Sequence, residues 1–332
     1  MEVLTMKLKP ITTEVYDTYW KFAKKRQDVF FRKIENPSDS LINDEILKHY
    51  KFTNAYRAAD RVSQFLIKDV IYKGAADNED TLFRILLFKL FNKIETWQLL
   101  EFYLEEISWE TFEFNKYDEV LQRAINHGGR IYNAAYIMPS GKRAFHNERK
   151  HRNHLRLIEF MMKDNLFGKI KDCKNLQEVF KTFMTYPSFG NFLSFQLTID
   201  VNYSEITNFD ENDFVVAGPG AINGIHKCFS DLKDYSYSDV IKYVKDRQNK
   251  EFDRLNLNFK TLWGRPLKLI DCQNLFCEVD KYSRVAHPEI KSKDQRNRIK
   301  RKYKPSNGQI NYWFPTKWNI NQKVKEFYNA IN

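Results

Sequence analysis

Apolar residues recur every three or four positions through most of the chain, a pattern that predicts a mainly α fold. Residues 54–71 show this spacing, and residues 83–91 are apolar almost throughout, which predicts a buried central helix. Strand-like alternation is short, with Arg130–Met138 the best candidate. Further helices are expected at Tyr117–Asn126, His154–Lys163, Leu176–Met184, Phe192–Ile199 and Ser238–Lys250, the last with Ser238 as its N-cap.

A length of 332 residues favours two domains or one two-lobed unit, which we divide into helical lobes at 12–205 and 206–332. The chain has no apolar run of about 18 residues and no signal-peptide core, so we expect a cytoplasmic protein that does not engage membranes. No CxxC pair occurs among its four cysteines, which argues against a zinc or iron–sulfur site. We expect no cofactor and no metal.

Charge narrows the choice of partner. The 54 Lys and Arg residues exceed the 43 Asp and Glu residues, giving a net charge of +11 that favours a polyanion, most often nucleic acid. The basic residues gather in two clusters, 142–156 and 291–304, where periodicity is weak. Both clusters are therefore expected to lie in surface loops or at helix ends that can contact phosphates.

Residues 214–229 read FVVAGPGAINGIHKCF, which predicts an apolar helix end, a turn at Gly218–Gly220 and a second helix from about Ala221. Glycines permit a tight turn and a close approach to a partner, and free N–H groups at a helix start bind phosphate. The pattern is typical of a helix–hairpin–helix clamp on the DNA backbone. An ordinary turn between helices would read the same.

Residues 269–288 interleave apolar and acidic positions. On a helix, Leu275, Val279 and Tyr282 share an apolar face, and Asp280 falls at its other edge. A carboxylate that borders such a face can have a raised pKa and act as a base. The neighbouring arc carries Asp271, Asn274, Glu278 and Lys281. A solvated charged face with Glu278 paired to Lys281 would explain the same residues.

Two further stretches carry polar residues among aromatic ones. Asn54, Arg57 and Asp60 lie near a helix start, and Gln196 and Asp200 share one helical face. Such groups can stack on and hydrogen-bond a flat base, or they can pin helices together through satisfied hydrogen bonds. Their spacing alone leaves both interpretations open.

Four stretches together resemble the alpha-glutamyl/putrescinyl thymine pyrophosphorylase family, which is similar to the helical domain attached to phage 5-hydroxymethyluracil DNA kinases. They are FTNAYRAADRVSQFL (52–66), RILLFKLFNKIETW (84–97), FGNFLSFQLTIDVNYS (189–204) and DCQNLFCEVDKYSR (271–284). The resemblance implies a divergent branch of the helix–hairpin–helix DNA glycosylases. It also implies an association with hypermodified phage DNA, in which some members act as anti-phage glycosylases on bulky bases.

That resemblance implies a catalytic role for Asp280, because residues 279–285 are similar to the V-D-x-x-x-x-R-V setting of the catalytic acid. The spacing from Asp to Arg is shorter than in that setting, and Asp280 lies farther downstream of the hairpin. Glu278 is the second candidate acid, and Lys281 is expected to contact a phosphate or help the leaving group. Ala221 and Ile222 stand where bifunctional relatives carry a lysine, which implies a monofunctional enzyme that uses water.

The sequence thus predicts a monofunctional DNA glycosylase that releases a hydroxymethylated or glucosylated pyrimidine from double-stranded phage DNA, in anti-phage defence, with no obligate protein partner. The alternatives are a base-hypermodification enzyme acting on a pyrophosphorylated hydroxymethyl pyrimidine, and a non-catalytic DNA-binding module. The expected base pocket comprises Phe52, Asn54, Tyr56, Arg57, Gln196 and Asp200. The expected DNA-backbone contacts are Gly218, Gly220, Asn223, Arg284, Arg298 and Lys300.

Overall fold

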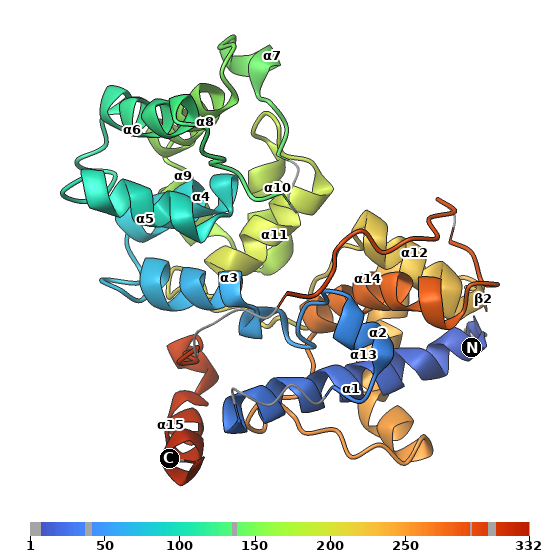
Figure 1. The fold of residues 1–332 in the computed structure, drawn as a ribbon. Coiled ribbons are helices and arrows are strands. Elements are labelled where there is room, and N and C mark those ends of the chain that lie inside the picture. The colour runs from blue at the N-terminus through green and yellow to red at the C-terminus, as the bar shows by residue number, and fades with distance from the viewer. Residues whose placement is uncertain (1–7, 37–41, 135–137, 293, 305–309, 332) are drawn as a thin grey trace, which may run out of the picture. The chain divides into compact units, whose positions relative to one another are not determined.

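A computed structural model describes residues 8–36, 42–134, 138–292, 294–304 and 310–331, and in these ranges the protein is mainly helical, as the apolar spacing predicts. The chain forms two compact units (Figure 1). Unit 1 comprises Met1–Asp60, Phe214–Tyr312 and Ile320–Asn332, and unit 2 comprises Arg61–Asp213 and Trp313–Asn319. Residues 12–60, which the sequence analysis assigns to the first lobe, are thus grouped with the acidic segment. No helix in the described ranges is long and apolar enough to span a bilayer.

Unit 1 is built around one buried helix. Its elements are β1 (Ile11–Thr12), α1 (Glu14–Glu35), α2 (Glu45–His49), the 3₁₀ helix η1 (Arg57–Ala59), α12 (Pro219–Cys228), β2 (Phe229–Asp231), α13 (Tyr237–Arg254), α14 (Leu269–Ala286) and α15 (Asn321–Ile331). Helices α12, α1 and α13 all pack against α14 (Figure 1). Strands β1 and β2 form one short antiparallel pair, in which Thr12 lies opposite Phe229.

Unit 2 has the central helix that residues 83–91 predict. Its elements are α3 (Arg61–Phe65), the π-helix η2 (Leu66–Ile71), α4 (Glu79–Phe91), α5 (Ile94–Tyr103), α6 (Phe114–Asn126), α7 (Lys142–Phe145), α8 (Lys150–Lys163), α9 (Leu166–Asp172), α10 (Leu176–Met184), α11 (Asn191–Val201) and the 3₁₀ helix η3 (Thr316–Trp318). Helix α4 is buried along almost its whole length and contacts α5, α8 and α11. Its first turn is capped by Asn78, whose side chain accepts from the Thr81 backbone N–H at 2.9 Å.

The GPG segment does not have the expected helix on its N-terminal side. Residues 214–218 are not helical, and the preceding helix, α11, ends at Val201. Only the second expected helix, α12, is present, and it starts at Pro219 with Gly218 as its N-cap. A short apolar run such as residues 214–217 fits either a helix end or a buried non-helical segment, so its pattern does not distinguish the two. The expected helix–hairpin–helix is therefore corrected to an extended segment followed by one helix.

The glycines of α12 allow it to pack closely on α14. A Cβ atom added to Gly220 would lie 3.1 Å from the Cys277 sulfur, and one added to Gly224 would lie 2.0 Å from the Phe276 carbonyl oxygen. Neither glycine has a positive φ angle. The sequence thus uses these glycines for close contact between helices and not for a left-handed turn.

Three other local predictions are wrong. The stretch 54–71 is not one helix but η1, α3 and η2, because Asp60 leaves the helical conformation with ψ 145°. Helix α13 is capped by Ser236, which forms a capping box with Asp239, while the Ser238 hydroxyl donates to the Val215 carbonyl. Residues 130–134 and 138 form no strand, and residues 135–137 lie outside the described ranges.

Candidate functional site

The polar arc of α14 faces the segment 52–57, so the structure brings together two of the stretches that the sequence singles out. Asp271 accepts from the Arg57 backbone N–H at 2.9 Å, and Asn274 donates to the Thr53 hydroxyl at 3.1 Å. Glu278 accepts from the Thr53 backbone N–H at 2.9 Å. The arc is therefore not a solvated face, because its side chains accept from or donate to the segment 53–57.

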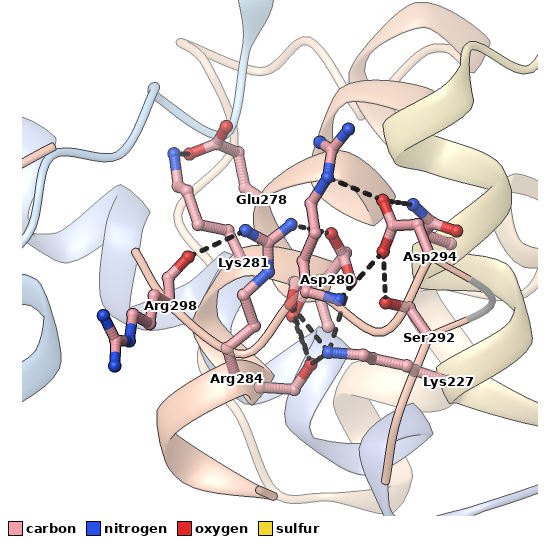
Figure 2. Close-up of polar contacts among 12 residues, drawn as sticks. Lys227, Glu278, Asp280, Lys281, Arg284, Ser292, Asp294 and Arg298 are labelled. Carbon is pink, nitrogen blue, oxygen red and sulfur yellow. Dashed lines mark hydrogen bonds and ion pairs between the residues drawn. The ribbon is translucent and has the colours of Figure 1, made fainter. Parts of the chain in front are cut away.

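Asp280 lies on the other edge of α14 in a buried ion-pair network with two cations (Figure 2). Its side chain is 2% exposed and contacts Arg284 at 2.5 Å and the Lys227 ammonium at 3.2 Å. Lys227 comes from α12 and also donates to the Asp280 carbonyl at 3.0 Å. Burial lowers the pKa of Lys227, and the nearby Asp280 carboxylate opposes this shift. Asp280 thus joins α12 to α14 in the core of unit 1.

Glu278 lies nearer the surface than Asp280 and is paired with a partly exposed lysine. Lys281 donates to it at 2.7 Å from one helical turn away, and the Lys281 side chain is 22% exposed (Figure 2). The Lys281 ammonium also lies 4.6 Å from the centre of the Phe52 ring, which stabilises the cation. The pairing of Glu278 with Lys281, left open by the sequence, is present.

Two charged residues absent from the predicted set complete the surroundings of Glu278. Arg26 on α1 donates to the Asn54 side-chain oxygen at 2.7 Å, and the Asn54 backbone N–H donates to Asp60 at 2.8 Å. Burial raises the pKa of Asp60 to about 7, and the Glu278 carboxylate adds to this shift. Asp60 stands in the same motif as Asn54, but Arg26 gives no sequence signal, since only the fold brings α1 to this segment.

The raised pKa of Asp60 predicts a pH dependence of stability. Between about pH 4 and pH 7 the folded protein retains a proton that the unfolded chain has released, so the free energy of unfolding falls as pH rises through this window. Asparagine does not titrate, so the Asp60→Asn variant does not undergo this fall in the free energy of unfolding. We expect the stability of Asp60→Asn relative to the wild type to increase from pH 5 to pH 8, by on the order of 1 kcal/mol.

Urea denaturation at several pH values measures this difference. Asp164→Asn is the control, because hydrogen bonds from Lys169 and Tyr186 lower the pKa of the Asp164 carboxyl group, which therefore titrates below the window. A constant difference between the wild type and Asp60→Asn from pH 5 to pH 8 would contradict the assignment.

The residues of the expected base pocket are found in both units. Phe52, Asn54, Tyr56 and Arg57 belong to unit 1, and Gln196 and Asp200 belong to α11 of unit 2. Tyr56 donates to the Arg265 carbonyl at 2.7 Å. Within unit 2, Asp200 is fully buried and forms an ion pair with Lys89 at 2.7 Å. The ion pair between α4 and α11 supports the helix-pinning interpretation for Asp200, and the base pocket stays a prediction.

The residues expected to contact the DNA backbone fall into two groups, one packed inside unit 1 and one exposed. Gly220 faces α14, Asn223 donates to Asp294 at 2.8 Å, and Arg284 is 11% exposed beside Asp280. Arg298 and Lys300, in contrast, are exposed on the segment 294–304. This segment is held in place by backbone hydrogen bonds of residues 301 and 303 to residues 49 and 51. Its exposed cations are suited to binding a phosphate backbone.

The second basic cluster carries less unpaired charge. Within residues 142–156, three cations form ion pairs with Glu148, Asp118 and Glu159. His151 and His154 are buried on α8, and burial lowers the pKa of His154 to about 4. Within the two clusters, exposed cations outside these ion pairs are therefore found mainly in residues 294–304, which stay the predicted polyanion surface.

Three hollows lie away from these residues. One of about 570 Å³ is lined by residues 249–259 of unit 1, and two of about 300 and 480 Å³ lie in unit 2. Asn249 and Asn258 give the first a polar wall. Glu278 and Asp60 are the candidate acids, because burial raises the pKa of Asp60 and the Glu278 carboxylate lies close enough to add to this shift.

Comparison with known proteins gives one family and one curated relative. Residues 13–292 match the family described as the helical domain of 5-hmdU DNA kinase. A protein of Bacillus phage SP10 named 5-hmdU DNA kinase is 27% identical over 286 residues, which cover 81% of this chain and 45% of that protein. The chain thus spans less than half the length of this relative, and no solved structure matches it. Because the match includes most of both units, this chain belongs to the family of 5-hmdU DNA kinase helical domains.

Proposed function

We propose that this protein is a DNA glycosylase that releases a modified pyrimidine, hydroxymethylated or glucosylated, from DNA. Membership of a family named for 5-hmdU DNA kinases supports a modified pyrimidine as the substrate. The chain has no GxxxxGK[ST] motif, so phosphoryl transfer is not proposed. The observation that carries the proposal is the pair of carboxyl groups, Glu278 and Asp60, beside one arginine at the segment 52–60.

The proposed reaction is a hydrolysis. The bond between C1′ of the sugar and the base nitrogen breaks, and its electron pair leaves with the base. A water oxygen bonds to C1′, one water proton goes to a carboxylate, and the departing base takes up one proton, which leaves an abasic site. The developing oxocarbenium-like sugar is stabilised by a nearby carboxylate.

Two neighbouring carboxyl groups suit this reaction, which needs a proton donor and a group that orients water. Asp60, with a pKa of about 7, holds a proton at neutral pH for a substantial fraction of the time and is a candidate donor to the departing base. Glu278 is the candidate carboxylate that orients water, because it is closer to the surface than Asp280. Asp280, the first candidate acid from the sequence, becomes the alternative to Glu278 in this proposal, and Lys281 is the candidate phosphate contact.

Base release from modified duplex DNA tests the proposal. DNA that carries hydroxymethylated or glucosylated pyrimidines is incubated with the protein and then treated with alkali, which breaks the strand at abasic sites. We expect breaks with the wild type and a rate at least about a hundredfold lower in Glu278→Gln or Asp280→Asn, whichever residue is the acid. The control is Glu119→Gln, which removes an exposed carboxylate paired with Arg123.

The outcomes separate the function from the site. Absence of abasic sites with every modified DNA would overturn the glycosylase proposal. Base release that is unchanged in both Glu278→Gln and Asp280→Asn would overturn the site assignment alone. Urea denaturation of each variant shows whether a loss of rate reflects a loss of fold.

One observation favours a second candidate, a DNA-binding module without catalysis. Asp280 is buried and paired with two cations, as expected for a structural residue. This candidate predicts DNA binding that weakens with added salt, is unchanged in Asp280→Asn and produces no abasic site. Base hypermodification remains a third proposal, which mass spectrometry of the DNA nucleosides distinguishes because base addition raises the mass and base release removes the base.

A further inference from the structure

Three potential metal ligands meet in unit 1 where α1 begins and α14 ends. Glu14 opens α1, His287 is the C-cap of α14, and Glu289 lies in the turn that follows. The His287 Nδ1 atom is 3.6 Å from a Glu14 oxygen and 3.5 Å from a Glu289 oxygen. One donor atom from each residue falls within 4.8 Å of the others.

These separations are close to those between the ligands of a bound transition metal. Zinc holds nitrogen and carboxylate oxygen at about 2.1 Å in tetrahedral geometry, which places neighbouring ligand atoms about 3.4 Å apart. Both measured distances from Nδ1 exceed that spacing by only a few tenths of an ångström. The Glu14 and Glu289 side chains are 64% and 59% exposed, so they can close the remaining gap at small cost.

The histidine ring is fixed by a contact on its other nitrogen. The Thr18 hydroxyl lies 2.7 Å from His287 Nε2, one helical turn after Glu14 on α1. Histidine ligands of metals usually have such a hydrogen bond on the second ring nitrogen, which sets the ring orientation and tautomer. With the His287 side chain only 17% exposed, Thr18 holds Nδ1 toward the two carboxylates.

We infer that Glu14, His287 and Glu289 form a binding site for a divalent transition metal ion, best matched by Zn²⁺, with water in the open position. One imidazole with two carboxylates suits this class of ion, whereas magnesium and calcium prefer all-oxygen sites. None of these three residues belongs to the proposed glycosylase site. A bound ion would link the start of α1 to the end of α14, just before the basic segment that ends at Lys304.

Calorimetric titration of the full chain, stripped with a chelator and titrated with zinc sulfate, tests the inference. We expect one saturable site and an affinity at least tenfold weaker in His287→Gln. Glu289→Gln, an exposed change that leaves the helices intact, should weaken binding severalfold. His49→Gln is the matched control, because His49 Nδ1 lies 3.5 Å from a single glutamate, Glu45, and this pair has only one carboxylate.

Cobalt provides a second measurement. Co²⁺ in the site should give visible absorption bands that disappear in His287→Gln and persist in His49→Gln. Absence of saturable zinc binding in the wild type would show that the three side chains form ion pairs only and would overturn the inference. Equal binding by the wild type, His287→Gln and Glu289→Gln would overturn it as well.

Discussion

Replacing Lys227 with methionine is expected to lower the free energy of unfolding by about 3–5 kcal/mol. The change removes one of the two cations that neutralise Asp280, whose side chain is 2% exposed. It also removes the hydrogen bond from the Lys227 ammonium to the Asp280 carbonyl, which joins α12 to α14. Leaving a buried carboxylate with one partner lowers the free energy of unfolding much more than removing one partner of a surface ion pair.

Lys281→Met is the matched control in urea denaturation. It removes a lysine that is ion-paired with Glu278 on the same helix but is more exposed than Lys227, so we expect a loss of about 1 kcal/mol or less. Adding Asp280→Asn to Lys227→Met should restore part of the lost stability, because the buried carboxylate that Lys227 neutralised is then absent. Equal effects of the two single lysine variants would contradict the structural role of the network.

Replacing Gly224 with alanine is expected to cost about 3 kcal/mol or more. The new Cβ would lie 2.0 Å from the Phe276 carbonyl oxygen, and a backbone atom inside a packed helix cannot move aside as a side chain can. Helices α12 and α14 would have to separate, which weakens the ion pair between Lys227 and Asp280. The better helix propensity of alanine returns only about 1 kcal/mol.

Thermal unfolding of two other glycine variants calibrates this result. Gly220→Ala should cost less, because its nearest neighbour is the side-chain sulfur of Cys277 at 3.1 Å. Gly74→Ala has no atom within 4 Å of the new Cβ and should be nearly neutral. A Gly224→Ala protein as stable as the Gly74→Ala protein would contradict the close packing of α12 on α14.

The helices that the sequence predicts correctly are those with strong periodicity. Helix α4 and the later helices α8, α10 and α11 lie at the expected positions, within a few residues at each end. Helix α14 holds Leu275 and Val279 in the core, as its apolar face requires. These elements are predictable because burial of one face is written directly into the spacing of apolar residues.

Predictions fail where polar contacts between distant segments decide the conformation. The helix expected over 54–71 is broken because Asp60 accepts from the Asn54 backbone N–H and because residues 53 and 57 bond to α14. The pairing of β1 with β2 joins two very short strands, which alternation cannot reveal. The GPG segment shows the same limit, because Gly220 serves a contact with Cys277 of α14, more than fifty residues away along the chain.

By itself, the sequence determined the helical class, the basic character of residues 291–304 and the identity of the stretches that carry the family resemblance. Only the tertiary structure decided which acids share an environment. It placed Glu278 beside Arg26 and Asp60, and it buried Asp280 between two cations. The physical reason is that periodicity reports which face of a helix is buried, whereas the proton affinity of a carboxyl group depends on charges and desolvation contributed by other helices.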